Sequence, residues 1–400
     1  MYVDALIIGA GPIGGYLASK LAESGHSTLM VEEHDQVGRP FQCAGLINPG
    51  SMEKVGLEHT ALSRIWGARI HGPNGTLVDI GTPNRTRTWS VCRKLFDESV
   101  VSQALSAGSS ILLNTIPVET SVNNDKVTTT LISEGSEIIV SSRVILGCDG
   151  AHSWVRRYHR MGRIRENMIG FQIDVTGYQH EDGKLDMYTG KEIAPGFFSW
   201  AIPTGTTTRI GTFSRPDLLG NKSSEETISN LLNHKLWKGR FDGCSEVGRY
   251  CGPVPAKPIK NPAKGRIMVF GDAAGLCKPT TGGGIGPGFT HVENSIDLIS
   301  TIISSDEINS KWTDKKARQI IKPIAKKHDR ARVLRDAFLT NSTDEELESI
   351  FKIWSKPEVL EIIQKYGEIE NPIPLGLKML KDVPEFRNIA VRAANSIIFA

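Results

Sequence analysis

The feature that most constrains this chain is a glycine-rich turn close to its start. The apolar residues 3–8 predict a buried strand, and Gly9-Ala10-Gly11-Pro12-Ile13-Gly14 follows it with the spacing GxGxxG. Residues 13–24 then predict a helix, and residues 28–32 predict a second strand that ends on Glu32. The segment therefore predicts a βαβ unit, which is a framework that binds dinucleotides.

Each glycine of the motif has a physical role in that framework. Gly9 permits the tight turn, Gly11 lets the backbone approach a pyrophosphate, and Gly14 lets the helix lie close to the sheet. Glu32 can accept hydrogen bonds from the adenosine ribose. Glycine pairs are common at turns, but a strand, a helix and a terminal acid in the right order favour dinucleotide binding over a purely structural turn.

Composition adds only the limits of an ordinary globular protein. The 400 residues suggest two or three domains, 39% are hydrophobic and 23% charged, and the net charge of +3 argues against a nucleic-acid partner. We expect neither a signal peptide nor a run of about 18 apolar residues that could span a membrane. The six cysteines have no metal-ligand spacing, so we expect no metal and reduced thiols in a cytoplasmic protein, with a Cys244–Cys251 disulfide left open.

Two further buried strands, at 142–150 and 266–275, each run into a glycine turn, and we expect them in the same parallel sheet as the first. The segment that follows the first of them predicts a mostly antiparallel sheet inserted as a second domain. We therefore expect an α/β fold with a Rossmann-type cofactor domain, an inserted β substrate domain and a C-terminal helical region. We expect the cofactor domain to consist of two parts, residues 1–165 and 251–300, the substrate domain of residues 166–250, and the helical region of residues 301–400. The segment of about 60–90 belongs either to the cofactor domain or to the substrate domain.

Two segments resemble motifs of FAD enzymes. VILGCDGAHSWVRR (144–157) resembles the DG motif, and VFGDAAGLCKPTTGGGIGPG (269–288) resembles the GD motif, of the hydroxybenzoate-hydroxylase superfamily. The resemblance implies a GR2-like domain with FAD as its cofactor. The residue types agree, because Asp272 ends an apolar strand where it can accept from the ribityl hydroxyls. Gly282-Gly283-Gly284-Ile285 then opens a helix whose free amides can face the flavin or the pyrophosphate.

Three charged side chains near these motifs have expected roles. Asp149 is expected to organise the DG loop and the cofactor, and Arg156 and Arg157 are expected either in solvent or against a phosphate. Arg93, in VCRKLFDESV, matches the superfamily's arginine at the head of a helix that reaches FAD. The alternative for Arg93 is a surface arginine at a helix start.

Two stretches narrow the resemblance to the geranylgeranyl reductase family. Arg39-Pro40-Phe41-Gln42-Cys43-Ala44-Gly45-Leu46 is similar to the family's cysteine loop, which has the form RCGEGL, but is one residue shorter. FFSWAIP (197–203) is similar to the YxWxFP strand that lines the family's lipid cavity, and the PxTGGGI of Pro279 to Ile285 is also typical of the group.

The alternation in FFSWAIP places Phe198, Trp200 and Ile202 on one face of a strand, which Pro203 ends. That face is either half of a packed core or the wall of a cavity. For a cavity, the resemblance implies that Trp200 stabilises cationic character at an alkene carbon. Cys43 either donates a proton, shapes the cavity or is an inert buried thiol.

The expected site residues follow from the motifs and from the resemblance. Those expected to contact FAD are Gly9, Gly11, Pro12, Gly14, Glu32, Cys43, Ala44, Gly45, Arg93, Val118, Asp272, Gly284 and Ile285. Those expected to take part in the chemistry are Cys43 and Trp200, and those expected to line the substrate cavity are Phe198, Trp200 and Ile202.

The resemblance implies an FAD-dependent reductase that saturates geranylgeranyl chains of archaeal-type ether lipids with a hydride from reduced FAD and a proton. No second GxGxxG marks a nicotinamide domain, so a ferredoxin, a deazaflavin or NAD(P)H delivered transiently is expected as the electron donor. FFSWAIP also resembles the WxWxIP of flavin-dependent halogenases, which leaves open a monooxygenase or halogenase of an aromatic or other small molecule. A membrane-peripheral flavoprotein that transfers electrons and reduces no alkene is the third alternative.

The last hundred residues predict helices, with a capping box within Ser342-Thr343-Asp344-Glu345-Glu346. One segment is densely basic and carries Lys311, Lys315, Lys316, Arg318, Lys322, Lys326, Lys327, Arg330, Arg332 and Arg335. It either docks on an anionic membrane surface or is an exposed helix covered in lysine, and Pro323 is expected to break or kink it. The membrane interpretation implies a cytoplasmic protein that is peripheral on the inner face of the cell membrane.

Overall fold

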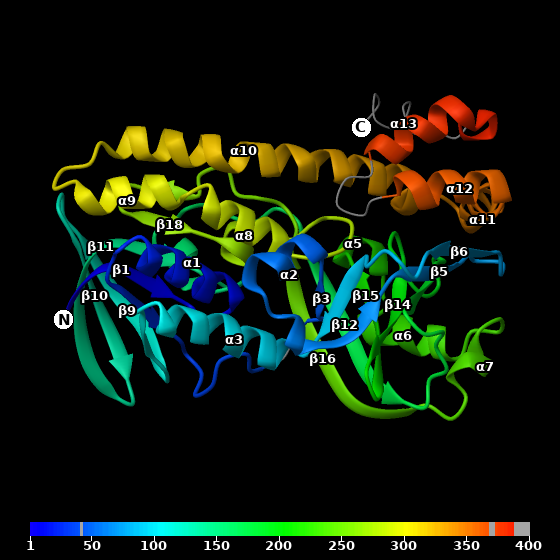
Figure 1. The fold of residues 1–400 in the computed structure, drawn as a ribbon, viewed down its shortest axis with the longest axis horizontal. Helices are drawn as coiled ribbons and strands as arrows, with labels where there is room; N and C mark the ends of the chain where they lie inside the picture. Colours follow the sequence, from blue (N-terminus) through cyan, green and yellow to red (C-terminus); the bar gives the residue numbers. More distant parts are fainter. Residues whose placement is uncertain (41–42, 368–372, 388–400) are drawn as a thin grey trace.

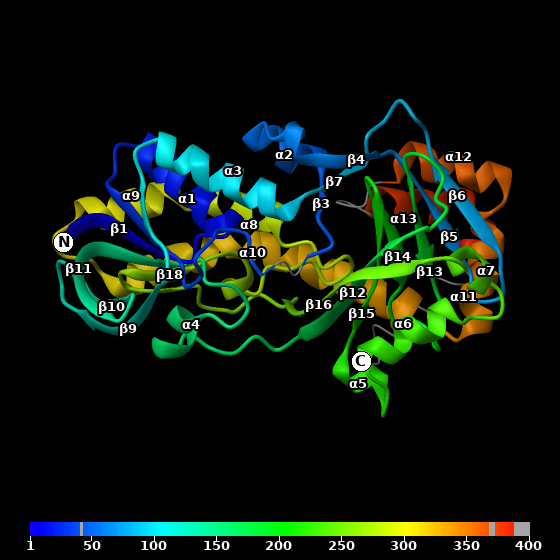
Figure 2. The same ribbon diagram turned by 90° about the horizontal axis from the view of Figure 1, so that it is seen from below.

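A computed structural model describes residues 1–40, 43–367 and 373–387 of the chain. Two sheets lie at opposite ends of the molecule, and one long helix, α10, runs across the top of both (Figures 1 and 2). The first sheet has eight strands and the second has seven, and a small three-stranded sheet accompanies them. This arrangement confirms the predicted α/β fold with a helical C-terminal region.

The first sheet brings together the distant strands that the sequence predicted. β1 pairs in parallel with both β2 and β11, and β11 pairs in parallel with β18. Its strands are β1 (Tyr2–Ile8), β2 (Thr28–Val31), β8 (Ser110–Leu112), β9 (Thr115–Val122), β10 (Val127–Ser133), β11 (Ser136–Gly147), β17 (Ala263–Lys264) and β18 (Ile267–Val269). β11 and β18 both end short of the glycine turns predicted to close them.

Both faces of the parallel part of the first sheet are buried, as expected for a parallel sheet covered by helices. On β1, Ala5 and Ile7 belong to one apolar cluster, whereas Leu6 and Ile8 belong to another on the opposite face. The helices of the chain are α1 (Pro12–Glu23), α2 (Pro49–Val55), α3 (Arg93–Ser106), α4 (Trp154–Tyr158), α5 (Pro216–Leu219), α6 (Ser224–Leu232), α7 (Lys238–Phe241), α8 (Ile285–Glu293), α9 (Ile296–Ser304), α10 (Ser310–Arg335), α11 (Asp344–Trp354), α12 (Pro357–Tyr366) and α13 (Ile373–Asp382). The segments η1 (Glu58–Thr60) and η2 (Gly271–Ala274) are short 3₁₀-helices, and η3 (Asp336–Thr340) is a short π-helix that follows α10.

The second sheet is mostly antiparallel and draws strands from two parts of the chain. Its order is β16-β12-β15-β14-β13-β5-β6, and β13 with β5 is a parallel pair. The strands are β5 (Gly67–His71), β6 (Leu77–Gly81), β12 (Asn167–Thr176), β13 (Lys184–Tyr188), β14 (Ser199–Thr204), β15 (Thr207–Ser214) and β16 (Ser245–Pro255). The small sheet consists of β3 (Leu46–Ile47), β4 (Ala61–Ile65) and β7 (Thr88–Val91).

Strand β14 contains most of FFSWAIP and corrects one prediction about it. Pro203 does not end the strand, because β14 continues to Thr204 and Pro203 lies opposite Thr208. Proline is tolerated near the end of a strand, where one missing N–H costs little of the ladder. The predicted alternation holds, since Trp200 and Ile202 belong to one apolar cluster and Ala201 belongs to another.

The C-terminal helices confirm one prediction and correct another. Thr343 caps α11 in a capping box with Glu346, as predicted. Of the break or kink expected at Pro323, the break is wrong, because helix α10 continues from Ser310 to Arg335, and the kink stays a prediction. Pro323 is exposed, so the carbonyl of Gln319 that it leaves without a partner can meet water, and buried side chains on both sides hold the helix in place.

Helix α8 carries a buried histidine directly behind the GD motif. His291 is fully buried, its ring lies 4.7 Å from that of Phe270, and neither ring nitrogen has a hydrogen-bond partner among the described residues. Burial without a partner disfavours the charged imidazolium and lowers the pKa of His291 to about 4.

Acid should therefore destabilise the fold through His291. Its pKa falls from 6.5 to about 4 on folding, so the unfolded chain binds more protons between these values. The stability contribution is complete above pH 6.5 and is lost as the pH falls towards 4. Between pH 7.5 and pH 5, the wild-type protein should lose about 2 kcal/mol more unfolding free energy than His291→Phe does, as measured by urea titration. An equal effect of His59→Phe, at an exposed position, would contradict this.

Candidate functional site

The GxGxxG turn has the geometry that its three glycines predicted. Gly9 adopts φ +97°, and a Cβ there would lie 2.5 Å from the carbonyl oxygen of Cys148 in the DG motif. A Cβ on Gly14 would lie 2.0 Å from the carbonyl oxygen of Gly9. A Cβ on Gly11, at the N-cap of α1, would meet no heavy atom within 4 Å, and no side chain caps the helix. The amides that open α1 therefore face free space of the kind a pyrophosphate fills.

Glu32 follows β2 and turns its carboxylate back to the glycine turn. One oxygen accepts from the amide of Ala10 at 2.9 Å, and the other lies 2.6 Å from Nδ1 of His34. The backbone carbonyl of Glu32 accepts from the amide of Thr115 at the start of β9. Val118 lies three residues further along β9 and is 39% exposed, and its expected contact with FAD stays a prediction.

A buried arginine ties the DG and GD motifs together. Arg156 donates to the carbonyl oxygens of Ala273, at 2.8 Å, and Ala151, at 2.7 Å. The expectation that Arg156 lies in solvent or against a phosphate is wrong, because its guanidinium is occupied by these two loops. Arg157 is exposed and donates to the carbonyl of Ser153.

Asp149 organises the DG loop but leaves one oxygen without a partner. Its Oδ2 accepts from the amide of Val155 at 2.9 Å, while its buried Oδ1 has no hydrogen-bond partner among the described residues. Burial raises the pKa of the Asp149 carboxyl. A buried acceptor of this kind, next to the glycine turn, fits a cofactor that brings hydroxyl donors.

Asp272 lies in η2, beyond the last residue of β18, the strand that it was expected to end, and its side chain lies beside Gly284 at the N-cap of α8. Its expected contact with FAD stays a prediction. Its Oδ1 accepts from the thiol of Cys277 at 3.2 Å, and a Cβ on Gly284 would come within 2.7 Å of the same oxygen. Burial raises the pKa of Asp272, while the Cys277 thiol and the positive charge of Arg93 act in the opposite direction. The GD motif and the head of α3 are therefore close enough to interact.

Arg93 opens α3 and points into this region. It forms a bidentate ion pair with Asp97, with N–O distances of 3.0 and 2.8 Å. Burial acts to lower the pKa of Arg93, but Asp97 and the neighbouring Cys43 outweigh it and raise that pKa. Arg93 is thus a fixed, partly desolvated cation between α3 and the cysteine loop.

The cysteine loop is fixed to the second sheet by two side chains that sequence reasoning missed. Gln172 of β12 donates to the carbonyl of Cys43 at 3.3 Å, and Arg209 of β15 donates to the carbonyl of Ala44 at 3.0 Å. The amide of Gly45 lies 3.4 Å from the Cys43 sulfur. Phe41 and Gln42 lie outside the described residues. The available signal was a single charged residue within the threonine-rich strand sequence TTRIGTFS of β15, because an arginine in a buried strand is almost always paired.

The three residues predicted to line a cavity lie in one apolar cluster. Trp200 and Ile202 are 4% and 2% exposed, and Phe198 packs against the same cluster, as do Ala44 and Leu46 from the cysteine loop. The ring of Trp200 lies 4.6 Å from that of Phe213. A Cβ on Gly282 would come within 2.4 Å of the Phe213 ring, so the TGGG run abuts the same cluster.

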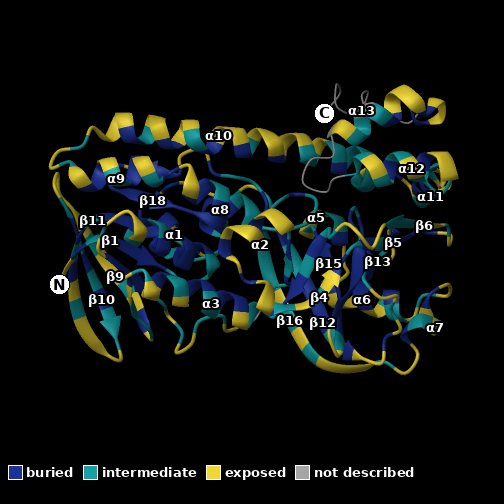
Figure 3. Ribbon diagram, viewed as in Figure 1, coloured by how far each residue is buried: buried dark blue, intermediate teal, exposed yellow. Residues whose placement is uncertain are grey.

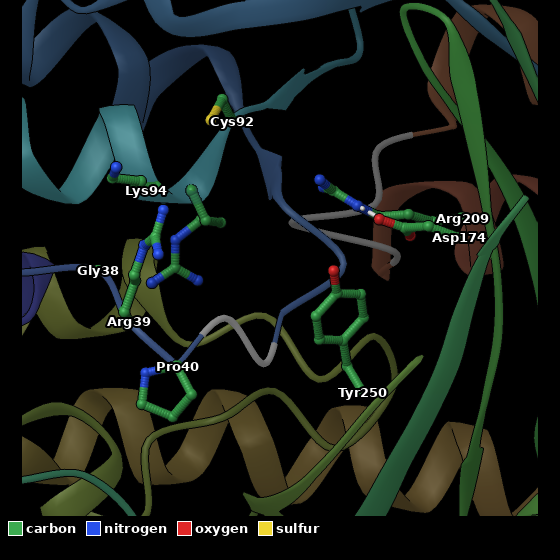
Figure 4. Close-up of a pocket in the computed structure, with 9 residues that line it drawn as sticks. Gly38, Arg39, Pro40, Cys92, Lys94, Asp174, Arg209 and Tyr250 are labelled. Carbon is green, nitrogen blue, oxygen red and sulfur yellow. Dashed lines mark ion pairs between the residues drawn. The ribbon is translucent and has the colours of Figure 1, made fainter. Parts of the chain in front are cut away.

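On its other side the cysteine loop borders a polar cavity of about 370 Å³. Figure 4 shows Arg39 and Lys94 on one side of it, facing Asp174, Arg209 and Tyr250 from the second sheet. Gly38, Pro40, Cys92 and Arg93 complete the lining. Arg209 and Asp174 are paired at 3.5 Å across the strands β15 and β12.

Two expectations concern cysteines and metals. All six cysteines, each within the described residues, are free thiols, which resolves the open question of Cys244 and Cys251. Among the residues described, no group of three His, Cys, Asp or Glu side chains is arranged to hold a metal ion.

Comparison with known proteins assigns this geometry to a cofactor. The FAD binding domain family matches residues 2–304 of the chain. A digeranylgeranylglycerophospholipid reductase of Methanoculleus marisnigri is 26% identical over 95% of this chain and 98% of its own. These matches confirm the resemblance to geranylgeranyl reductases and establish FAD as the cofactor, in agreement with the open glycine turn and the orphan Asp149 oxygen.

Solved structures share the fold. A geranylgeranyl bacteriochlorophyll reductase-like protein from Thermoplasma acidophilum superposes with a TM-score of 0.83 at 20% identity, covering 97% of this chain and 99% of its own. The halogenase PltM in complex with FAD superposes with a TM-score of 0.70 at 14% identity, covering 98% and 85%. The architecture therefore serves more than one flavin chemistry.

The geometry at Gly11 yields a direct test of the cofactor site. Gly11→Ala should leave the apoprotein's melting temperature unchanged, because the added methyl meets no protein atom within 4 Å and the backbone there is extended. The same methyl should weaken FAD binding by about tenfold or more, because it fills the space of the pyrophosphate. Flavin fluorescence during titration of the apoprotein measures this. Gly376→Ala, whose Cβ also meets nothing within 4 Å, is the matched control and should bind FAD normally.

Proposed function

The chain belongs to the FAD binding domain family, and from that premise we propose that it is a reductase of prenyl double bonds. The substrates would be the geranylgeranyl chains of archaeal-type membrane ether lipids. One observation carries the proposal: Ala44 and Leu46, next to Cys43, pack in the same apolar cluster as Trp200 and Ile202. An apolar wall therefore borders the loop assigned to the flavin.

The reaction requires such a wall because an isolated trisubstituted alkene is not polarised. Reduced FAD supplies the hydride when it is bound. The protein must hold the chain against the flavin, exclude water and deliver a proton to the second alkene carbon. Trp200 and Phe198 would place aromatic faces beside the tertiary carbon, where they stabilise developing positive charge. Ile202, on the same strand face, would extend the apolar contact along the chain.

Cys43 is the side chain best placed to deliver the proton. It lies in the loop between the FAD residues and the apolar wall, and the positive charge of Arg93 is close enough to interact with it. The neighbouring guanidinium would stabilise the negative charge that stays on sulfur once the proton has left.

The role of Cys43 can be separated from its structural contribution. Cys43→Ala should lower the rate of alkene reduction in a single turnover by about 100-fold or more while FAD remains bound, because only the proton transfer is lost. Stopped-flow flavin reoxidation in the presence of lipid measures the rate. Cys244→Ala, in the core of the second sheet, should reduce the lipid at the wild-type rate. Wild-type kinetics in Cys43→Ala would exclude Cys43 as the proton donor.

Two other flavin chemistries compete with this proposal, a monooxygenase or halogenase and an electron-transfer flavoprotein. The halogenase superposes less well than the reductase-like protein, with TM-scores of 0.70 and 0.83. The sequence match to a reductase over 95% of the chain supports the reductase. The electron donor would be a ferredoxin, a deazaflavin or NAD(P)H.

Mass spectrometry of the lipid product tests the function itself. Chemically reduced holoenzyme incubated anaerobically with digeranylgeranylglycerophospholipid should add two mass units per double bond. Unchanged lipid mass, with the flavin still reduced, would favour the electron-transfer alternative. Rapid oxygen consumption triggered by an aromatic compound and not by lipid would favour the monooxygenase or halogenase.

The outer face of α10 supports a peripheral position on an anionic membrane. Arg332 and Arg335 turn inward to Glu166, but eight other basic residues of the helix lie exposed (Figure 3). These are Lys311, Lys315, Lys316, Arg318, Lys322, Lys326, Lys327 and Arg330. The C-terminal end of the same helix reaches the apolar wall, since Arg335 lies 5.1 Å from the ring of Phe197. Within the described residues, every helix is too short or too polar to traverse a bilayer.

Vesicle binding tests the role of this face. The protein should cosediment with phosphatidylglycerol vesicles but not with phosphatidylcholine vesicles, and high salt should release it. Replacing Lys315, Lys316, Lys322 and Lys326 with Glu should weaken binding by at least about 4 kcal/mol, at about 1 kcal/mol for each basic residue near the surface. The matched control changes Lys235 and Lys238 of the second domain to Glu. Unchanged sedimentation of the α10 variant would exclude this helix as the docking face.

A further inference from the structure

The polar cavity beside the cysteine loop differs in character from the apolar wall. Apart from Arg93, none of its lining residues is among those assigned to FAD. It lies between loop 38–40, the head of α3 and the strands β12, β15 and β16. Five of the nine residues that line it are charged, and Pro40 is the one aliphatic side chain among these nine, so the lining suits a charged ligand better than a prenyl chain.

The charge of the cavity is mainly positive. Among the described residues that line it, four are cations and Asp174 is the single carboxylate. Arg93 forms an ion pair with Asp97. Arg209 forms an ion pair with Asp174 and donates hydrogen bonds to two backbone carbonyls. Arg39 is exposed and forms no ion pair among the described residues, and Lys94 reaches Glu98 only at 3.8 Å on the surface. Two cations are therefore available to a ligand at its rim.

The backbone adds to this positive field. Helix α3 has 14 residues, and its first positions, Arg93 and Lys94, line the cavity together with Cys92 at the N-cap. No side chain caps the helix, so its first amides remain open to an acceptor. The positive end of a helix next to Arg39 and Lys94 is the combination that binds phosphate oxygens.

We propose that this cavity is a phosphate-binding site beside the flavin, which holds the phosphorylated end of one of the reaction's two polar partners. The inference rests on the proposed function, in which those partners are the headgroup of the lipid and the electron donor. A volume of about 370 Å³ exceeds that of a phosphate group alone, so part of the attached group also enters. The hydroxyl of Tyr250 and the carboxylate of Asp174 face that part from the second sheet.

Inorganic pyrophosphate added to the FAD-loaded enzyme probes the site without turnover. In the FAD-loaded enzyme the phosphates of FAD already occupy their own site, so added pyrophosphate reports on the proposed one. We expect a saturable change in the flavin absorbance, and we expect salt to weaken the binding of pyrophosphate. Arg39→Ala and Lys94→Ala should each raise the dissociation constant by about tenfold, and Arg39→Lys should restore part of the loss. Lys235→Ala, on the far part of the second domain, is the control. A dissociation constant that is unchanged in the double variant, Arg39→Ala with Lys94→Ala, would overturn the proposal. Loss of FAD from this double variant would also overturn it, because the cavity would then belong to the cofactor.

Two further titrations identify the source of the phosphate. If the site holds the electron donor, the double variant should raise the half-saturating concentration of NADPH for flavin reduction and leave that of the lipid unchanged. If the site holds the headgroup, the double variant should bind geranylgeranyl diphosphate more weakly than the wild type does and should bind the uncharged geranylgeraniol with unchanged affinity. Equal affinities of wild type and variant for all three compounds would overturn the proposal. Failure to reduce any alkene while pyrophosphate still binds would reject the proposed function and leave the site intact.

Discussion

The site depends on backbone segments that approach one another with no side chain between them. Gly9 lies against Cys148, Gly14 against Gly9, and Gly284 against Asp272, each at distances that a Cβ would not tolerate. Gly9 thereby joins the turn after β1 to the DG motif, and a Cβ on Gly288 of the GD motif would meet Ile13 of α1 at 2.4 Å. The three segments meet at the carboxyl edge of a parallel sheet, where ligands of open α/β sheets bind. Since both faces of the sheet are buried, the three turns cannot shift independently.

Buried arginines fix the loops that these glycines bring together. Arg156 joins the DG and GD motifs through two carbonyls, and Arg209 attaches the cysteine loop to the second sheet. A guanidinium suits this task because it is always charged and its planar fork can satisfy several acceptors at once. Arg335 does the same at the end of α10, where it contacts Glu166 and the carbonyl of Pro279. Cations at these positions therefore set the relative placement of the sheets.

The cysteine loop separates two environments of opposite character. On one side Trp200 and Ile202 form an apolar wall with Ala44 and Leu46. On the other, Arg39 and Lys94 face a polar cavity at the head of α3. A flavin held at this loop would meet an apolar chain and a charged partner from different directions, which suits a reaction that takes electrons from one molecule and delivers them to another.

The sequence by itself determined the glycine turn, Glu32 after its strand, the alternation of FFSWAIP and the cap of α11, and its motifs also placed three distant strands in one parallel sheet. Only the tertiary structure decided which side chains meet across the chain. Arg209 bonds a carbonyl 165 positions away and Gln172 one 129 positions away, and no periodic pattern encodes such pairs. Tertiary packing also overrode the local preference of proline, since buried neighbours carry α10 through Pro323 and the ladder carries β14 past Pro203. The physical reason is that local signals fix backbone conformation, whereas the site is built from side chains that burial and charge pairing select across the whole chain.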